Sequence, residues 1–112
     1  MKILCVDDEP AVLLTTALVV KSAGYDVLTA TNVEEGTRLL CSEPIGLILL
    51  DCVPNRKALM LEAKKLGTPI ILCTNRLSDD DDPDVGLVKA ILRKPILPPE
   101  LVQSIRKALP SS

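Results

Sequence analysis

Residues 47–51 read Leu-Ile-Leu-Leu-Asp, and residues 70–74 read Ile-Ile-Leu-Cys-Thr. The apolar part of each segment is continuous and does not alternate with polar residues. Continuous runs of this length are typical of strands that helices cover on both faces, and such strands belong to parallel sheets. The two segments therefore predict an α/β fold built around a parallel sheet.

Three other short apolar runs, at 3–6, 27–30 and 90–92, bring the expected strands to five. Between them, apolar residues recur at helical spacing and typical helix-starting residues precede them. The expected helices span 10–23, 32–43 (with Thr31 or Asn32 as the N-cap), 55–66 and 98–109. Residues 77–89 leave little room for a helix, so the helix between the last two strands, the fourth in chain order, is predicted to be short or missing.

The composition favours one globular domain that spans residues 1–112, with no output domain. The chain has 112 residues, of which 47% are hydrophobic and 25% charged, a balance that excludes disorder as the main state. The net charge of −2 argues against a nucleic-acid-binding protein, which would show a basic face. No apolar stretch is long enough to cross a membrane, and the first residues do not form a signal peptide.

Missing residue types narrow the function further. The chain has no histidine, which excludes Ser-His-Asp hydrolases, Cys-His proteases and imidazole metal sites. It has no Trp or Phe and a single tyrosine, so aromatic stacking on bases is excluded as well. The four cysteines form no Cys-x-x-Cys pair and lie mostly in or beside expected strands, which predicts reduced, buried thiols in a cytoplasmic protein.

Chemically active residue types gather where the expected strands end. In open α/β sheets, ligands bind at the carboxyl ends of the strands. No glycine-rich loop follows the first strand, so a dinucleotide or P-loop site is not expected. The residues that follow strands one, three, four and five are Asp7, Asp8, Glu9, Asp51, Thr74 and Lys94.

This set of side chains predicts a cation and phosphoryl chemistry. Crowded carboxylates repel one another unless a cation lies among them, and hard oxygen ligands favour Mg²⁺ or Mn²⁺. A carboxylate can itself attack phosphorus to give an aspartyl phosphate, which a lysine and a hydroxyl can then contact. Taken singly, these residues could be helix caps, turn residues or surface charges. Their joint placement at four strand ends favours the functional interpretation.

Four segments resemble the receiver domain of bacterial two-component response regulators. They are Ile-Leu-Cys-Val-Asp-Asp-Glu-Pro (3–10), Leu-Ile-Leu-Leu-Asp (47–51), Ile-Ile-Leu-Cys-Thr (70–74) and Leu-Arg-Lys-Pro-Ile-Leu-Pro-Pro-Glu-Leu (92–101). The resemblance covers essentially the whole chain, and the separation of Asp8 from Asp51 fits the family. It implies a flavodoxin-like, doubly wound five-stranded parallel sheet in the order 2-1-3-4-5, which places strands one and three side by side.

The resemblance also implies roles for individual residues. Asp51 is the implied phosphoacceptor, Thr74 the residue that hydrogen-bonds the phosphoryl group, and Lys94 the cation that pairs with it. The implied ligands of Mg²⁺ (or Mn²⁺) are Asp8, Asp51, the backbone carbonyl of Val53 and, through water, Asp7.

The family's activity implies a protein partner. The chain is expected to take a phosphoryl group from a phosphohistidine on a sensor histidine kinase or a histidine phosphotransfer protein, because it has no histidine of its own. It would take part in its own phosphorylation and dephosphorylation without being a turnover enzyme. Its signal would leave the domain by protein contact.

Departures from the family pattern keep a second function open. The loop after Asp51 reads Cys-Val-Pro without the usual glycine, the segment from Asp51 to Thr74 is short, and Ile91 stands where the family has an aromatic residue. These features favour a degenerate receiver that acts as a phosphorylation-independent interaction module, whereas the complete set of strand-end residues opposes it. A Mg²⁺-dependent phosphohydrolase would need Asp-x-Asp after the first strand, where this chain has adjacent aspartates.

The first expected helix is apolar nearly all round, with polar residues mainly in its last turn. Whichever side faces the sheet, an apolar stripe stays outside, and such a patch usually marks a protein contact. The helix is therefore predicted to form a homodimer or partner interface. Its two sides carry Val12, Thr15, Thr16, Val19 and Ala23 on one, and Leu14, Ala17 and Leu18 on the other.

Overall fold

The computed structural model of the chain describes residues 1–51, 53–74 and 88–109. Within these ranges strands and helices follow one another as the sequence predicts, each boundary lying within about two residues of its expected position. The elements are β1 (Lys2–Val6), α1 (Pro10–Ser22), β2 (Asp26–Ala30), α2 (Val33–Ser42), β3 (Ile45–Leu50), α3 (Arg56–Leu66), β4 (Ile70–Thr74), β5 (Ala90–Arg93) and α4 (Pro98–Ala108).

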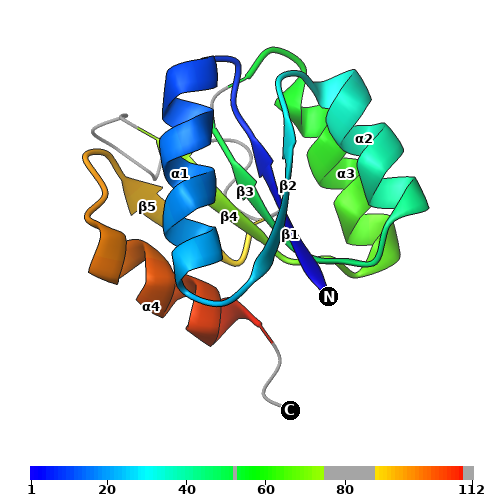
Figure 1. The fold of residues 1–112 in the computed structure, drawn as a ribbon. Coiled ribbons are helices and arrows are strands. Elements are labelled where there is room, and N and C mark those ends of the chain that lie inside the picture. The colour runs from blue at the N-terminus through cyan, green and yellow to red at the C-terminus, as the bar shows by residue number, and fades with distance from the viewer. Residues whose placement is uncertain (52, 75–87, 110–112) are drawn as a thin grey trace.

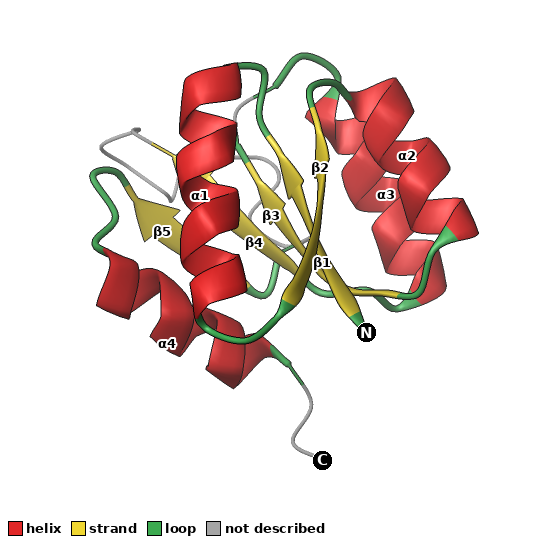
Figure 2. Cartoon of the chain, in the orientation of Figure 1, coloured by secondary structure: helices red, strands yellow, loops and turns green. Residues whose placement is uncertain are grey.

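The five strands form one parallel sheet in the order β2-β1-β3-β4-β5. Helices α1 and α4 cover one face of this sheet, and α2 and α3 cover the other (Figure 1, Figure 2). The doubly wound, flavodoxin-like architecture and its strand order are therefore confirmed. The helix expected to be short or missing falls on residues 77–89, most of which lie outside the described residues.

Local signals explain where the helices begin and end. Pro10 occupies the first turn of α1, where its missing N–H costs nothing. Asn32 is the N-cap of α2, and its side chain accepts a hydrogen bond from the Glu35 N–H at 2.8 Å. Gly67 ends α3 with φ +72°, a left-handed conformation that glycine adopts without strain. None of the helices in the described ranges has the length and apolar character needed to cross a lipid bilayer.

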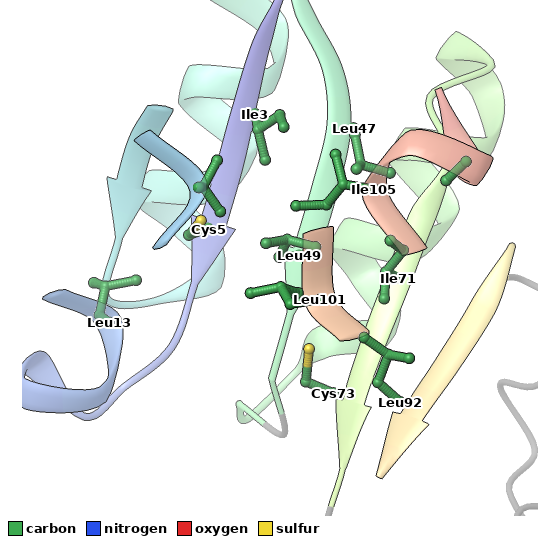
Figure 3. Packing of buried hydrophobic residues seen from close by; sticks show 12 residues of the cluster. Ile3, Cys5, Leu13, Leu47, Leu49, Ile71, Cys73, Leu92, Leu101 and Ile105 are labelled. Carbon is green, nitrogen blue, oxygen red and sulfur yellow. The ribbon is translucent and has the colours of Figure 1, made fainter. Parts of the chain in front are cut away.

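Alternating side chains along the buried strands supply two separate cores. On β1, Ile3 and Cys5 face α1 and α4, whereas Leu4 and Val6 face α2 and α3. Figure 3 shows the first of these cores, with side chains of β1, β3 and β4 beneath Leu101 of α4. Both sheet faces are thus buried, which is why the central strands read as continuous apolar runs.

Helix α1 packs against the sheet through one stripe of side chains, which the sequence pattern could not distinguish from the exposed stripe. Leu13, Ala17 and Val20 are buried against the sheet, while the side chains of Leu14 and Leu18 are 62% and 56% exposed. Grouping Ala17 with the two leucines was therefore wrong, because Ala17 lies on the inner side of the helix. The expectation that an apolar stripe stays outside is confirmed, and Leu14 and Leu18 carry it.

Candidate functional site

Three of the predicted site residues meet at the carboxyl edge of the sheet, on the side of α1 and α4. Asp7 continues the row of Ile3 and Cys5 beyond the end of β1. Asp51 follows β3 and Lys94 follows β5, and both line the same cavity as Asp7. The parallel strands therefore deliver their end residues to one place, as the topology predicts.

Backbone hydrogen bonds hold these residues in line with the sheet. The Asp7 N–H donates to the Ala30 carbonyl at 3.1 Å, and the Asp51 N–H donates to the Val6 carbonyl at 3.0 Å. The Lys94 N–H donates to the Thr74 carbonyl at 2.7 Å. Each site residue thus prolongs the hydrogen bonding of its strand by one step, which fixes its position relative to the neighbouring strand.

Lys94 and Asp51 form the central ion pair of the site. The Lys94 Nζ donates a hydrogen bond to Asp51 Oδ2, and the two side chains are 33% and 17% exposed. Burial alone would lower the pKa of Lys94, but the hydrogen bond and the negative charge of Asp51 outweigh it and raise that pKa above its ordinary value. Lys94 is therefore a permanent cation fixed against the carboxylate.

Asp7 is the most buried carboxyl of the site, at 6% exposure. Desolvation, together with the hydrogen bond to Asp51 and the charge of that residue, raises the pKa of Asp7 to about 6. The Glu9 N–H, 2.9 Å from Asp7 Oδ1, and the charge of Lys94 act in the opposite direction and only partly offset this rise. Two carboxyl groups thus share one small space with a single ammonium group.

The remaining predicted residues surround this centre without joining its ion pair. Thr74 ends β4 and continues the row of Ile70 and Leu72, which faces α2 and α3; its side chain is buried. Val53 packs its side chain into the same core. Asp8 is exposed between β1 and α1. The structure therefore brings Asp7, Asp51 and Lys94 together and leaves Asp8 at the rim.

The oxygen ligands of the site fit a hard divalent cation that keeps several water ligands better than a metal that needs three or four protein ligands. In the described part of the chain, no three His, Cys, Asp or Glu side chains are grouped closely enough to hold a metal ion by themselves. Mg²⁺ needs only one or two carboxylates, and it fills its other positions with water and phosphate oxygens. Asp7 and Asp51 lie beside one ammonium group, that of Lys94, so a divalent cation at this edge would find two carboxyl groups to bind.

One contact and one peptide bond of the site were not foreseen in the sequence. The Glu9 N–H binds the Asp7 carboxylate, so the residue before the helix positions an acid and does not cap α1 with its own side chain. The signal was an aspartate two residues before that N–H, the spacing of an Asx-turn. The bond between Lys94 and Pro95 is cis. Taken singly, Asp51 could have been a helix cap, but the N-cap of the helix that follows it, α3, is Asn55.

Fold and site together define a flavodoxin-like α/β protein with an acidic centre and one lysine at the carboxyl edge of its sheet. A profile of the response regulator receiver domain matches residues 3–106. The chain therefore belongs to the response regulator receiver domain family, and the resemblance seen in the sequence is confirmed.

Curated relatives share this domain over almost the whole chain. The transcriptional regulatory protein GlrR of Escherichia coli is 33% identical over 98% of this chain and 26% of its own length. The transcriptional regulatory protein AruR of Pseudomonas aeruginosa is 32% identical over 96% of this chain and 49% of its own length. The chain thus spans between a quarter and a half of the length of these relatives.

Solved structures agree on the fold. The response regulator TrrA of Thermotoga maritima, solved in complex with Mg²⁺ and BeF, superposes with a TM-score of 0.86 at 30% identity, over 97% of this chain and 100% of that chain. A CheY-like receiver domain protein of Methanospirillum hungatei gives 0.85 at 29% identity, over 95% of this chain and 90% of that one.

Proposed function

We propose that this chain is a working phosphoacceptor domain and that Asp51 receives the phosphoryl group. The observation that carries the proposal is the Lys94–Asp51 ion pair, at a strand end beside a second carboxyl group, Asp7. A nucleophilic carboxylate needs a fixed counter-charge for the oxygens of the incoming group, and Lys94 supplies one. The degenerate-module alternative does not require these three residues to meet.

In the proposed transfer, one bond to phosphorus forms as another breaks, and residues of the site accompany the change in charge. An Asp51 carboxylate oxygen attacks phosphorus, a P–O bond forms, and the P–N bond to the donor imidazole breaks. Lys94 exchanges its carboxylate contact for a phosphoryl oxygen, so the positive charge follows the new negative charge. We place the Thr74 hydroxyl as the hydrogen-bond donor to another phosphoryl oxygen. The donor is a partner's phosphohistidine, because this chain contains no histidine.

A divalent cation completes the proposed centre. Asp8 and Asp51 would hold Mg²⁺ or Mn²⁺ with the Val53 carbonyl, and Asp7 would act through water. When bound, the cation neutralises phosphoryl and carboxylate oxygens together. The Mg²⁺ in the TrrA complex supports this proposal at the level of the family.

The decisive experiment is the intact mass of the protein after incubation with a small acyl phosphate and Mg²⁺. Wild type should gain one acid-labile phosphoryl group, and Asp51→Asn should gain none. Lys94→Ala should be modified more slowly, because the phosphoryl charge loses its partner. Asp26→Asn, at the opposite edge of the sheet, is the matched control and should behave as wild type. An unmodified wild type would support the degenerate module instead.

We also propose that the exposed leucines of α1 form a contact with a second copy of the chain or with the phosphoryl donor. Leu14 and Leu18 lie one turn apart on the outer side of the helix. Light scattering should show a dimer for wild type and a monomer for Leu14→Glu with Leu18→Glu. A wild type that stays monomeric and binds no donor through this helix contradicts the proposal.

A cytoplasmic location fits the free thiols of Cys5, Cys41 and Cys73 among the described residues. We propose a sensor histidine kinase or a histidine phosphotransfer protein as the donor and a protein contact as the output. Like receiver domains in general, the chain would not be a turnover enzyme.

A further inference from the structure

The outer side of α3 is basic, although the chain as a whole is acidic. The chain has 15 acidic and 13 basic residues and a net charge of −2. The sequence of α3 contains only one acidic residue, Glu62, beside four basic residues. Three of these, Lys57, Lys64 and Lys65, are exposed. Lys65 lies 3.7 Å from the Glu62 carboxylate, so this helix presents a surface of net positive charge.

The exposed lysines share one side of the helix with an exposed leucine. Lys57, Leu61, Lys64 and Lys65 recur at helical spacing and point away from the sheet, whereas the buried residues of α3 face it. We call these four residues the basic stripe. The side chain of Leu61 is 45% exposed. Lys57 and Lys64 lie on either side of Leu61 along the helix, about 10 Å apart at the usual rise per residue.

The start of α3 shows that Lys57 is not placed for the stability of its helix. Acidic side chains stabilise the N-terminus of a helix, and basic ones destabilise it. Lys57 nevertheless lies in the first turn of α3, which contains no acidic residue, and the N-cap Asn55 makes no capping hydrogen bond with its side chain. In contrast, α2 has Glu34 and Glu35 in its first turn. Residues that break such local rules are expected at functional sites.

The basic stripe lies apart from the candidate phosphoacceptor site. Helix α3 lies beside α2, on the face of the sheet opposite to α1 and α4 (Figure 1, Figure 2). Asp7, Asp51 and Lys94 lie on the side of α1 and α4. Within residues 1–51, 53–74 and 88–109, the ammonium groups of Lys57 and Lys64 form no ion pair or hydrogen bond. Their charges are therefore available to a partner.

The composition of the stripe distinguishes between anionic partners. A membrane-binding helix inserts a broad apolar side into the lipid, but the apolar side of α3 is buried in the core and the stripe offers only Leu61. A nucleic-acid-binding surface belongs to a basic domain, and this chain is acidic and has no Phe or Trp. One apolar side chain between cations suits a protein segment that carries an apolar residue between acidic ones.

We propose that the basic stripe of α3 docks an acidic segment of a partner protein, whose carboxylates pair with Lys57 and Lys64 and whose apolar side chain packs on Leu61. Exposed ion pairs each contribute little, so the contact is weak and sensitive to salt. The proposal does not depend on phosphorylation of Asp51, because the stripe contains none of the residues of the candidate site.

Three labelled peptides test the charge and the apolar contact by fluorescence anisotropy on the wild-type chain. They consist of three repeats of Glu-Glu-Leu, of Gln-Gln-Leu or of Glu-Glu-Ser. The Glu-Glu-Leu peptide should bind at least about tenfold more tightly than Gln-Gln-Leu, because only its carboxylates attract the lysines. It should bind about threefold more tightly than Glu-Glu-Ser, which lacks the apolar contact. Equal affinities for Glu-Glu-Leu and Gln-Gln-Leu, or no binding of Glu-Glu-Leu, would overturn the proposal.

Two double variants locate the contact. Lys57→Glu with Lys64→Glu reverses two charges of the basic stripe and should weaken binding of the Glu-Glu-Leu peptide by about tenfold or more. Lys21→Glu with Lys107→Glu changes the net charge equally on α1 and α4 and is the matched control. The control should bind within about twofold of wild type, because its charges are remote from the stripe. An equal loss in both double variants would show an effect of net charge and overturn the proposal.

The single variant Lys57→Glu separates binding from folding. Its carboxylate lies in the first turn of α3, where it favours the helix, so the melting temperature should rise slightly. Peptide binding should nevertheless weaken by about threefold or more, since one attraction becomes a repulsion. Loss of binding in a more stable variant cannot result from unfolding. A Lys57→Glu variant that binds Glu-Glu-Leu as wild type does would contradict the proposal.

Vesicles test the other source of negative charge. Wild type should not sediment with vesicles of phosphatidylserine and phosphatidylcholine, because the stripe has too little apolar surface to insert. Sedimentation of wild type that is lost in Lys57→Glu with Lys64→Glu would assign the stripe to a membrane surface and overturn the proposal of a protein partner.

Discussion

The two faces of the sheet are built from similar residues but packed differently. On the side of α2 and α3, the core side chains are almost completely buried, and Leu59 and Met60 close over the strands. On the side of α1 and α4, the core includes two cysteines and leaves a cavity of about 750 Å³. The candidate site residues Asp7, Asp51 and Lys94 line that cavity. One face is therefore closely packed, and the other leaves room beside the candidate site.

The largest effect should come from matched truncations on the two faces. Leu59→Ala on the closed face should cost about 2–5 kcal/mol of unfolding free energy, because it creates a new void in a packed core. Leu101→Ala should cost less than about 2 kcal/mol, since its side chain already borders empty space. Urea unfolding with unchanged m-values measures both. Equal costs would mean that the two faces are equally well packed.

A second, smaller effect is the pH dependence of the unfolding free energy, which Asp7 on the side of α1 and α4 should cause. The pKa of Asp7 is about 6 in the folded chain and about 4 when unfolded, so the folded state keeps a proton that the unfolded state has lost. Without divalent cations, stability should therefore fall as pH rises through this window, by at least about 1 kcal/mol, and should level off above it. Thermal melts from pH 4 to 8 check this. Asp7→Asn should remove this part of the slope; a variant with the wild-type slope would show that another group carries it.

Mg²⁺ should offset the repulsion between the carboxylates at the same edge and so stabilise the folded chain. A ligand of the native state at tenfold its dissociation constant adds about 1.4 kcal/mol of stability, and the melting temperature should rise accordingly. Asp8→Ala should lose most of this response, although Asp8 is exposed and contributes no packing. Ca²⁺, which prefers more ligands and longer distances, is the comparison ion and should stabilise less. No response of the wild type to millimolar Mg²⁺ would favour the degenerate module.

The smallest effects should come from the outer sides of the helices. Leu14→Ser on α1 and Leu61→Ser on α3 both change exposed side chains, so each should alter unfolding free energy by less than about 0.5 kcal/mol. Dilute protein should be used, to keep any self-association out of the measurement. A large cost for either variant would show that the two faces also differ outside their cores.

Much of the fold could be predicted, because strands that are buried on both faces consist of continuous apolar runs in the sequence. The runs at 47–50 and 70–73 are apolar throughout, and each lies inside an observed strand. Strand ends were less predictable, because polar residues such as Lys2, Asp26 and Arg93 join strands through their backbones. Helix α1 could not be oriented, because both of its sides are apolar and only packing chooses Leu13, Ala17 and Val20.

The site was predictable to the extent that strand ends converge. Asp7, Asp51 and Lys94 could be grouped from topology alone, and they meet as expected. The pKa of Asp7 depends on how deeply the side chain is buried and on which neighbour it contacts. The spacing of residues along the sequence predicts neither its burial nor its contacts. The cavity depends on the summed volumes of side chains from β1, β3, β4, α1 and α4. No single segment of the sequence therefore predicts it.

The backbone hydrogen bonds that carry Asp7, Asp51 and Lys94 one step beyond their strands also set the timescale on which the site can open. Their amide protons are bonded to the carbonyls of Ala30, Val6 and Thr74, three buried residues that each end a strand. Solvent exchange at these three amides therefore requires the sheet itself to open, and they should exchange as slowly as the core amides of β1 and β3. The edge that carries the candidate site should therefore open only together with the sheet. Adjustments during the proposed phosphoryl transfer would then fall to side chains such as that of Lys94.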